Sequence, residues 1–369
     1  MCTKESYDHQ LYKHQEKIDT ADAVAFTYLS KEKVDFFPYK QPELADNELR
    51  VNMLYAGLCM SDSHTGRSKW GPATYPLAPG HEIIGEVAEV GKKVTNFKKG
   101  DQVAFGTLRA CCEKCKYCLS NKEPLCRGDC QEERFTYGLH WGGYSTQLQQ
   151  PADFFFHLPK GLDVKRAAPL LCAGITVYNP IKQYAKPGMK TCVIGIGGLG
   201  HLAVQFLAKL GYEVTAVTNT MEKEKFIKSL GATNVITMKD KETLKNYYEK
   251  HDLIVNTLPI SHGFEDYFYL CAPGCYFVQV GVPDVDEKVS FSINTIALKE
   301  IHLVGSLVGS RNDINEMLQL CVDKDIYPMV EEFAFEDFDK ALDKLENGKP
   351  IFRCVVNCQD YAKKHGLFK

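Results

Sequence analysis

A glycine-rich turn between two apolar segments constrains the fold of this chain more than any other feature. Residues 191–195 are apolar enough for a buried strand, and apolar positions recur at helical spacing from residue 199 to residue 210. Glycines in the pattern G-x-G-x-x-G allow a tight turn and a close approach to a pyrophosphate, which then sits at the positive end of the helix. The pattern predicts a dinucleotide site at Gly195, Gly197, Gly198, Leu199 and Gly200.

The segments after this turn alternate between strand and helix candidates. We predict strands at residues 213–218, 234–238, 253–258, 275–281 and 301–306, and helices at residues 221–230 and 264–271. Apolar strands separated by helices are typical of a parallel, doubly wound sheet. The fold class predicted for this region is therefore α/β.

The chain before the turn has a different pattern. Short β segments broken by Gly and Pro, at residues 49–56, 83–90 and 101–105, predict a compact, barrel-like β fold. Residues 333–356 also have β character, and we expect them to return to this first domain. A chain of 369 residues is long enough for two hydrophobic cores. We predict a β-rich domain at residues 1–175 and 326–369, including a polar extension at 1–22, and a dinucleotide-binding domain at 176–325.

Four cysteines separated by two, two and seven residues form the sharpest local signal. Thiolates at these gaps can close a tetrahedral shell around one zinc ion within a single loop, which leaves no position for a substrate. Unrelated buried thiols rarely fall at metal-ligand spacing. Cys111 and Cys130 lie beside the set, and either could replace a neighbour. We predict a structural zinc site at Cys112, Cys115, Cys118 and Cys126.

A second set of candidate ligands, Cys59, His81 and Cys172, is dispersed along the chain. Each alone is most often a core residue. Together they supply two thiolates and an imidazole, the shell that leaves a fourth position for water or a substrate oxygen. Zinc held in this way polarises a carbonyl and stabilises an alkoxide. Asp62 can orient the His81 imidazole, and we expect Glu82 to approach the metal when water is absent.

Two residues near Cys59 are candidates for proton transfer. Ser61 offers a hydroxyl and His64 an imidazole, and together they can pass a proton between a buried alcohol and solvent. The alternatives are a turn hydroxyl for Ser61 and a surface histidine for His64.

The residues after the strand at 213–218 indicate which cofactor is bound. An acidic side chain there would hold the ribose 2′-hydroxyl of NAD, but residues 218–221 contain no acid, and the first one is Glu222. Hydroxyls, an amide and an amine accept a 2′-phosphate without repulsion. We therefore favour NADP(H), with a neutral NAD site and a solvated lysine as the alternative. The predicted contacts are Thr218, Asn219, Thr220 and Lys223.

The chain contains 15 cysteines, which raises the question of its compartment. Its first 28 residues carry five acids and no apolar core segment, which argues against a secretory signal. We expect the reducing cytosol, where clustered cysteines bind metal. No run approaches the ~20 apolar residues that cross a bilayer, and a net charge of −3 gives no reason to expect nucleic acid or an anionic membrane as partner.

With these residues in place, the chain resembles the zinc-containing medium-chain dehydrogenase/reductase superfamily, and within it the cinnamyl alcohol dehydrogenase-like branch. The likeness runs from about residue 23 to residue 356. One departure is the Thr-Asn-Thr run at residues 218–220, where the family commonly has serine. Besides the glycine turn and the four-cysteine loop, the likeness rests on residues 75–85, 142–145, 170–176, 280–283 and 305–310.

The resemblance implies a GroES-like catalytic domain interrupted by a Rossmann domain. It implies catalytic zinc on Cys59, His81 and Cys172, with Glu82 as an occasional ligand, and a proton relay from Ser61 through the cofactor ribose to His64. The nicotinamide-side contacts that it implies are Thr176, Val280, Gly281, Val282, Ser306, Gly309 and Ser310.

The activity implied by the resemblance is hydride transfer between NADP(H) and an alcohol/aldehyde pair, mainly as aldehyde reduction, in a pocket between the two domains.

Members of the family are commonly homodimers paired through Rossmann edge strands, for which residues 301–306 are the candidate here. Two alternatives remain: a dehydrogenase scaffold kept as an assembly subunit through its N-terminal arm, and an NADPH-dependent reductase of conjugated C=C bonds.

Overall fold

The computed structural model describes residues 12–130, 134–136, 141–259, 265–348 and 352–369. The chain divides into two compact units. The first runs to Cys172 and also includes Ser310–Val322 and Met329–Lys369, and the second consists of Ala173–Gly309 and Asp323–Pro328. This division differs from the predicted domain bounds mainly at residues 310–322, which pack with the first unit, and also at residues 173–175 and 326–328, which belong to the second. One cause is Arg311, which forms ion pairs with Glu113 and Glu123 of that unit.

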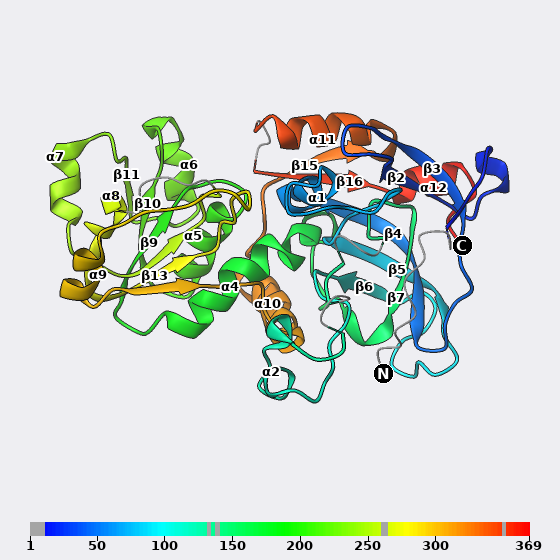
Figure 1. Cartoon of the computed structure of the whole chain (residues 1–369), viewed down its shortest axis with the longest axis horizontal. Coiled ribbons are helices and arrows are strands. Elements are labelled where there is room, and N and C mark those ends of the chain that lie inside the picture. Colours follow the sequence, from blue (N-terminus) through cyan, green and yellow to red (C-terminus); the bar gives the residue numbers. More distant parts are fainter. Residues whose placement is uncertain (1–11, 131–133, 137–140, 260–264, 349–351) are drawn as a thin grey trace. The chain divides into compact units, whose positions relative to one another are not determined.

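The second unit contains a six-stranded sheet in the order β11-β10-β9-β12-β13-β14 (Figure 1). Its strands are β9 (Lys190–Ile194), β10 (Glu213–Val217), β11 (Asn234–Ile236), β12 (His251–Asn256), β13 (Cys271–Gln279) and β14 (His302–Gly305). All neighbouring strands are parallel. This order, with the first strand central and the later ones added outward on each side, is that of a Rossmann fold. The predicted doubly wound parallel sheet is confirmed.

Helices cover this sheet because its strands bury apolar side chains on both faces. On one face, Ile194 and Ile254 belong to a buried cluster with Phe268 of α8. Toward the other face, α5 packs against β9 and β10 and buries Leu202 and Phe206. The helical segments of this unit are α4 (Ala173–Tyr184), α5 (Gly200–Lys209), η6 (Met221–Lys223), α6 (Glu224–Ser229), α7 (Lys241–Leu244), η7 (Lys245–Tyr247), α8 (Glu265–Phe268) and α9 (Ile293–Lys299).

The helix predicted at residues 264–271 is shorter in the structure. Helix α8 ends at Phe268, and Cys271 already belongs to β13, where it pairs with His251 of β12. Residue 264 lies outside the described part of the chain. Nowhere in the described ranges is a helix both long and apolar enough to span a membrane.

The first unit is built on β strands. Its larger sheet has the order β15-β16-β4-β5-β6-β8, with β7 also paired to β4, and a smaller sheet has the order β1-β3-β2. The strands are β1 (Lys13–His14), β2 (Ala23–Tyr28), β3 (Val34–Lys40), β4 (Glu48–Leu58), β5 (Ile83–Val90), β6 (Gln102–Phe105), β7 (Gln147–Pro151), β8 (Phe155–His157), β15 (Val330–Ala334) and β16 (Arg353–Asn357).

Short helices connect these strands. They are η2 (Ile18–Thr20), α1 (Met60–Gly66), α2 (Lys116–Leu119), η3 (Glu123–Leu125), η4 (Ala152–Phe154), α3 (Val164–Ala167), η5 (Ala168–Leu171), η8 (Phe335–Asp337), α11 (Phe338–Glu346) and α12 (Gln359–Lys364), with α10 (Arg311–Lys324) starting in this unit. The β character predicted for residues 333–356 is only partly correct. β15 and β16 do join the sheet of the first unit, but α11 lies between them and buries Phe338, Leu342 and Leu345 at helical spacing.

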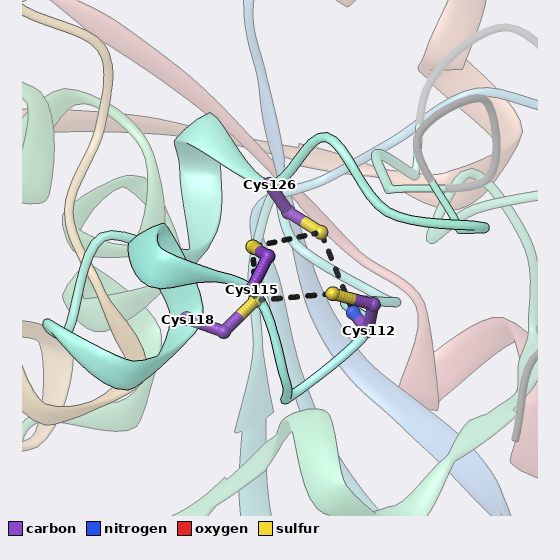
Figure 2. A group of neighbouring side chains, drawn as sticks. All are labelled: Cys112, Cys115, Cys118 and Cys126. Carbon is purple, nitrogen blue, oxygen red and sulfur yellow. Dashed lines mark hydrogen bonds between the residues drawn. The ribbon is translucent and has the colours of Figure 1, made fainter.

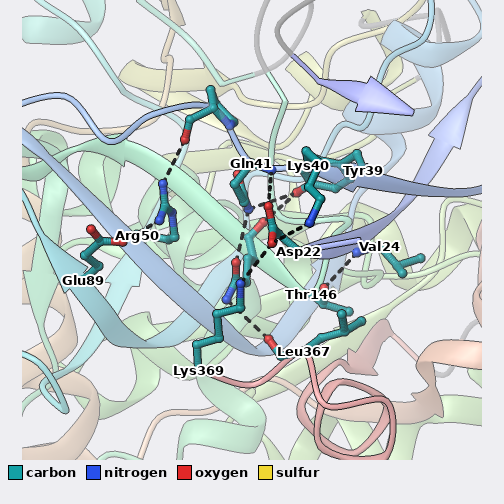
Figure 3. A network of polar contacts seen from close by, with 12 residues as sticks. Asp22, Val24, Tyr39, Lys40, Gln41, Arg50, Glu89, Thr146, Leu367 and Lys369 are labelled. Atoms are coloured by element: carbon teal, nitrogen blue, oxygen red, sulfur yellow. Dashed lines mark hydrogen bonds and ion pairs between the residues drawn. The ribbon is translucent and has the colours of Figure 1, made fainter. Parts of the chain in front are cut away.

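Polar contacts join the last residue of the chain to the strands near its beginning (Figure 3). Nζ of Lys369 lies 3.2 Å from Oδ1 of Asp22, and Nζ of Lys40 lies 3.3 Å from the same oxygen. The backbone oxygen of Lys369 accepts a hydrogen bond from Nδ2 of Asn52 at 2.6 Å. Burial would raise the pKa of Asp22, but Lys369, the amide of Gln41 and Lys40 together lower it below its usual value.

Candidate functional site

Four side chains from three separate segments of the first unit meet at one point. Cys59, His81, Glu82 and Cys172 each place one potential ligand atom within 4.8 Å of the others. The structure thus brings together all of the residues predicted for the catalytic zinc site.

The register of the larger sheet explains why these segments meet. Leu58 at the end of β4 pairs with Cys354 of β16, and Ala56 pairs with Ile83 at the start of β5. The residues just beyond these pairs therefore lie at the same end of neighbouring strands. Helix η5 packs against β4, β5 and β16, and Cys172 follows it directly.

The spacing and chemistry of these side chains fit a zinc ion. Sγ of Cys59 lies 3.9 Å from Sγ of Cys172. Two sulfurs bound tetrahedrally to one zinc at about 2.3 Å would lie about 3.8 Å apart. The hydrogen bond with Cys172 lowers the pKa of Cys59 well below its usual value, and the same bond raises the pKa of Cys172. The titration of one thiol is therefore coupled to that of the other.

Asp62 sets the orientation of His81. Nδ1 of His81 lies 2.8 Å from Oδ1 of Asp62, and both side chains are buried. The same oxygen accepts a hydrogen bond from the backbone of Gly80 at 2.9 Å, and the hydroxyl of Tyr144 donates to Oδ2 at 2.9 Å. Because an ionised carboxylate can only accept, Nδ1 carries the hydrogen and Nε2 keeps its lone pair for a metal. Tyr144 was not among the predicted site residues.

Arg353, the first residue of β16, is a second site residue that the sequence analysis missed. Its Nη2 donates to Oε1 of Glu82, and the two side chains are 5% and 0% exposed. Burial raises the pKa of Glu82 to about 7, although the Arg353 charge opposes that shift. Gly57 makes room for this carboxylate, since a Cβ there would lie 2.1 Å from Oε2 of Glu82. No local pattern marks Arg353, which lies 271 residues from its partner.

Helix α1 carries both predicted relay residues. Ser61 and His64 are three residues apart, so they lie on the same side of the helix. Oγ of Ser61 lies 3.5 Å from Sγ of Cys59. The His64 ring stacks on Trp70, with centroids 5.1 Å apart and an interplanar angle of 16°. The hydroxyl is therefore beside a candidate ligand, and the imidazole is held further along the helix.

The four cysteines of the 112–126 loop form a separate cluster in which the side chains point toward one another (Figure 2). Sγ of Cys118 lies 3.6 Å from Sγ of Cys115 and 3.9 Å from Sγ of Cys112, and Sγ of Cys115 lies 4.0 Å from Sγ of Cys126. A hydrogen bond from the backbone of Cys118 lowers the pKa of Cys115 to about 6. These spacings also match a zinc tetrahedron. Within the described residues, this cluster does not include Cys111 or Cys130.

The glycine turn lies between β9 and α5, as predicted. A Cβ at Gly200 would lie 1.9 Å from the backbone oxygen of Gly195, so only glycine lets the turn close. A Cβ at Gly197 would meet nothing within 4 Å, which leaves open backbone at the start of the helix for a phosphate. The hydroxyl of Thr257 donates to the oxygen of Gly195 at 2.6 Å and supports the turn. Gly198 and Leu199 are half-buried within it.

The remaining predicted cofactor contacts lie after strands of the second unit, with two exceptions. Thr218 is half-buried after β10, and the exposed residues that follow it are Asn219, Thr220 and Lys223. Near β13 and β14, the predicted contacts are the buried Val280, Gly281 and Gly309, the half-buried Ser306 and the exposed Val282. Thr176 is instead buried in α4. Ser310 belongs to the first unit, where its hydroxyl donates to Oδ2 of Asp313 at 2.6 Å.

Two family descriptions match the chain. The alcohol dehydrogenase GroES-like domain matches residues 45–160, and the zinc-binding dehydrogenase family matches residues 198–323. Aldehyde reductase AdhA of Synechocystis sp. is 36% identical over 326 residues, which cover 88% of this chain and 95% of that protein. The chain belongs to the zinc-containing medium-chain dehydrogenase/reductase superfamily. Within it, this dehydrogenase falls in the cinnamyl alcohol dehydrogenase-like branch, because cinnamyl alcohol dehydrogenase 8 of Arabidopsis thaliana is 32% identical over 89% of the chain and 92% of that protein.

Solved structures of related enzymes share the fold of this dehydrogenase. A cinnamyl alcohol dehydrogenase of Helicobacter pylori, crystallised with NADP(H), superposes with a TM-score of 0.82 at 31% identity, covering 91% of this chain and 98% of the other. A cinnamyl alcohol dehydrogenase of Sorghum bicolor gives a TM-score of 0.84 at 29% identity, with the same coverage. The resemblance stated from sequence, with its GroES-like and Rossmann domains, is therefore confirmed.

Proposed function

We propose that this dehydrogenase reduces aldehydes with NADPH at a zinc ion held by Cys59, His81 and Cys172. The observation that carries the proposal is the convergence of these three side chains, which are far apart in sequence, into one cluster of metal-binding spacing. A purely structural scaffold would have no reason to keep a three-residue shell with an open fourth position. The aldehyde reductase of Synechocystis sp. is a full-length relative and supports the direction of the reaction.

The residues of the chain prepare the site in distinct ways. When bound, zinc polarises the substrate carbonyl and NADPH supplies the hydride. Asp62 keeps Nε2 of His81 available as a ligand, and Arg353 holds Glu82 close to the thiols as an occasional one. Ser61, beside Cys59, donates a proton to the product oxygen. His64, on the same helix, passes a proton from solvent back to Ser61.

The choice of NADPH rests on the residues after β10. The side chains of residues 218–221 are neutral, and Lys223, just after Glu222, is exposed. A 2′-phosphate would meet hydroxyls, an amide and an amine rather than a carboxylate. The structure of the Helicobacter pylori relative contains NADP(H), which supports the same choice here.

The loop cysteines Cys112, Cys115, Cys118 and Cys126 have a structural role in this proposal. A closed shell of four thiolates leaves no position for substrate, and such a site contributes directly to folding free energy. Clustered cysteines that bind metal also fit a reducing compartment such as the cytosol.

We also propose that the enzyme is a homodimer joined through β14. Among the described strands, β14 pairs only with β13, so its other edge is free to pair. Apolar side chains on and near this strand are exposed, with exposed fractions of 39% for Leu303, 68% for Ile293 and 87% for Leu298. An exposed edge of this kind favours pairing with a second copy. Replacing Leu303 with Lys should convert the dimer into a monomer in sedimentation velocity.

The activity is tested by steady-state kinetics with NADPH and NADH across aliphatic, aromatic and α,β-unsaturated aldehydes. The expected result is a higher kcat/KM with NADPH and, from the unsaturated aldehydes, an allylic alcohol with its C=C bond intact. A saturated aldehyde as product would instead favour a C=C reductase. Absence of turnover in a preparation with full zinc content would favour an assembly subunit.

A further inference from the structure

The loop that follows β14 contains a residue in an unusual conformation. Val308 has a φ of 32°, and its side chain is buried. Positive φ is rare for residues other than glycine and is a genuine outlier for a β-branched one. Such a conformation is costly and persists only where surrounding contacts hold it. The position is notable because Ser306 and Gly309 of the same loop are proposed nicotinamide-side contacts.

Asn179 of α4 supplies the contact that holds this loop. Its Nδ2 donates to the backbone oxygen of Val308 and lies 3.5 Å from Oγ of Ser306. At its start, the loop is held by the sheet, because the backbone N–H of Ser306 donates to the oxygen of Gln279 at 3.2 Å. One amide group therefore connects the helix to two loop residues, one of which is strained.

The same side of α4 also carries a proposed cofactor contact. Thr176 lies three residues before Asn179, which places both on one side of the helix. The loop held by Asn179 and the hydroxyl of Thr176 are thus brought together by a single helix. All of these residues belong to the second unit, which also contains the glycine turn.

We propose that Asn179 is a positioning residue for the nicotinamide end of the cofactor. It acts through the loop: by bonding to Val308 and Ser306, it keeps residues 306–309 in the one conformation that receives the nicotinamide side. This inference rests on the proposed use of NADPH. Binding of the adenosine end of the cofactor, near the glycine turn and Lys223, does not depend on Asn179.

The test compares binding of two ligands to the full-length zinc-loaded enzyme and needs no turnover. NADPH occupies both ends of the cofactor site, whereas adenosine 2′,5′-bisphosphate lacks the nicotinamide half. In Asn179→Ala, the Kd of NADPH should rise about tenfold, as expected for loss of one well-placed hydrogen bond. The Kd of adenosine 2′,5′-bisphosphate should stay the same. Calorimetric titration measures both constants.

Asn234 provides a matched control at the opposite edge of the sheet. Its Nδ2 lies 3.5 Å from Oε1 of Glu213, far along the strand order from β14. Asn234→Ala should change neither constant. If Asn179→Ala folds poorly, Asn179→Asp keeps the size of the side chain and replaces the donor with an acceptor facing the oxygen of Val308, so it should weaken NADPH binding in the same selective way.

Val308→Gly tests the role of strain. Glycine adopts positive φ without a Cβ penalty, so the double variant Asn179→Ala, Val308→Gly should recover part of the NADPH affinity lost in Asn179→Ala. No recovery would overturn the role given to Val308.

Three outcomes separate this inference from the proposed function. Unchanged binding of both ligands in the Asn179 variants overturns the inference and leaves the function intact. An equal loss for both ligands also overturns it, because it shows a general loosening of the unit. Failure of the unmodified enzyme to bind either ligand overturns the proposed use of NADPH, and the inference with it.

Discussion

Arg353 and Glu82 form a buried ion pair beside the thiols of Cys59 and Cys172. Glu82 lies immediately after a proposed zinc ligand, and Arg353 begins the strand that pairs with the end of β4. The pair thus ties the proposed catalytic metal site to the C-terminal strand of the chain. Since both charges are removed from water, the loss of either one should be costly to folding.

Replacing Arg353 with Met should lower the free energy of unfolding by about 3 kcal/mol, because a buried carboxylate loses its partner. Urea unfolding of the zinc-loaded protein measures the change. The double variant with Glu82→Gln should lose less than the sum of the two single variants, since no charge is then left alone. Strictly additive losses would show that the two side chains are not coupled.

Cys172→Ser should remove one zinc ion per chain and abolish aldehyde reduction, because the serine hydroxyl is a poor replacement for a thiolate ligand. The far-ultraviolet circular dichroism should remain close to that of the unmodified protein. Metal analysis alongside NADPH oxidation provides the measurement. Retained turnover in a variant that lacks this zinc would defeat the catalytic-zinc proposal.

Cys115→Ser should lower the stability of the protein more than its activity. Structural zinc sites supply folding free energy, and this loop is tied to α10 by ion pairs from Arg311 to Glu113 and Glu123. We expect a fall in Tm of several degrees with loss of one zinc ion, and turnover per remaining folded molecule should change little. Differential scanning calorimetry at matched zinc content tests this. A Tm equal to that of the unmodified enzyme would contradict a structural site.

Lys223→Glu should weaken NADPH binding about tenfold to a hundredfold, because a charge-assisted bond to the 2′-phosphate is replaced by repulsion. NADH binding should be nearly unchanged. Lys225→Glu is the control, since it makes the same charge change two residues away at an exposed position. Equal effects of the two variants would indicate a general field effect rather than a contact.

Asp22→Asn should alter the pH dependence of stability. The folded pKa of Asp22 is lowered, so its contribution is present above the unfolded pKa of about 3.9 and is lost as the pH falls through the folded pKa. At pH 7 the variant should be less stable by up to about 1 kcal/mol, and the difference should shrink below about pH 4. Urea unfolding at several pH values measures it; a constant difference would show that Asp22 is not stabilised as a carboxylate.

The four-cysteine loop and the glycine turn could be predicted from sequence because their signals are local. The four cysteines lie within a single loop, and the glycine turn needs only a strand before it and a helix after it. Cys59, His81 and Cys172 were each ambiguous alone, and the prediction depended on combining them into a known ligand shell. The helix α11 was missed because its flanking strands dominate the pattern of residues 333–356.

The amino-acid sequence by itself determined which chemical groups are available and most of the segments that become strand or helix, since spacing and apolar periodicity act over a few residues. Only the tertiary structure decided that Arg353 meets Glu82, that Tyr144 supports Asp62 and that Asn179 holds Val308. These partners lie between 82 and 271 residues apart along the chain. Their meeting depends on strand register and helix packing, which no short pattern records.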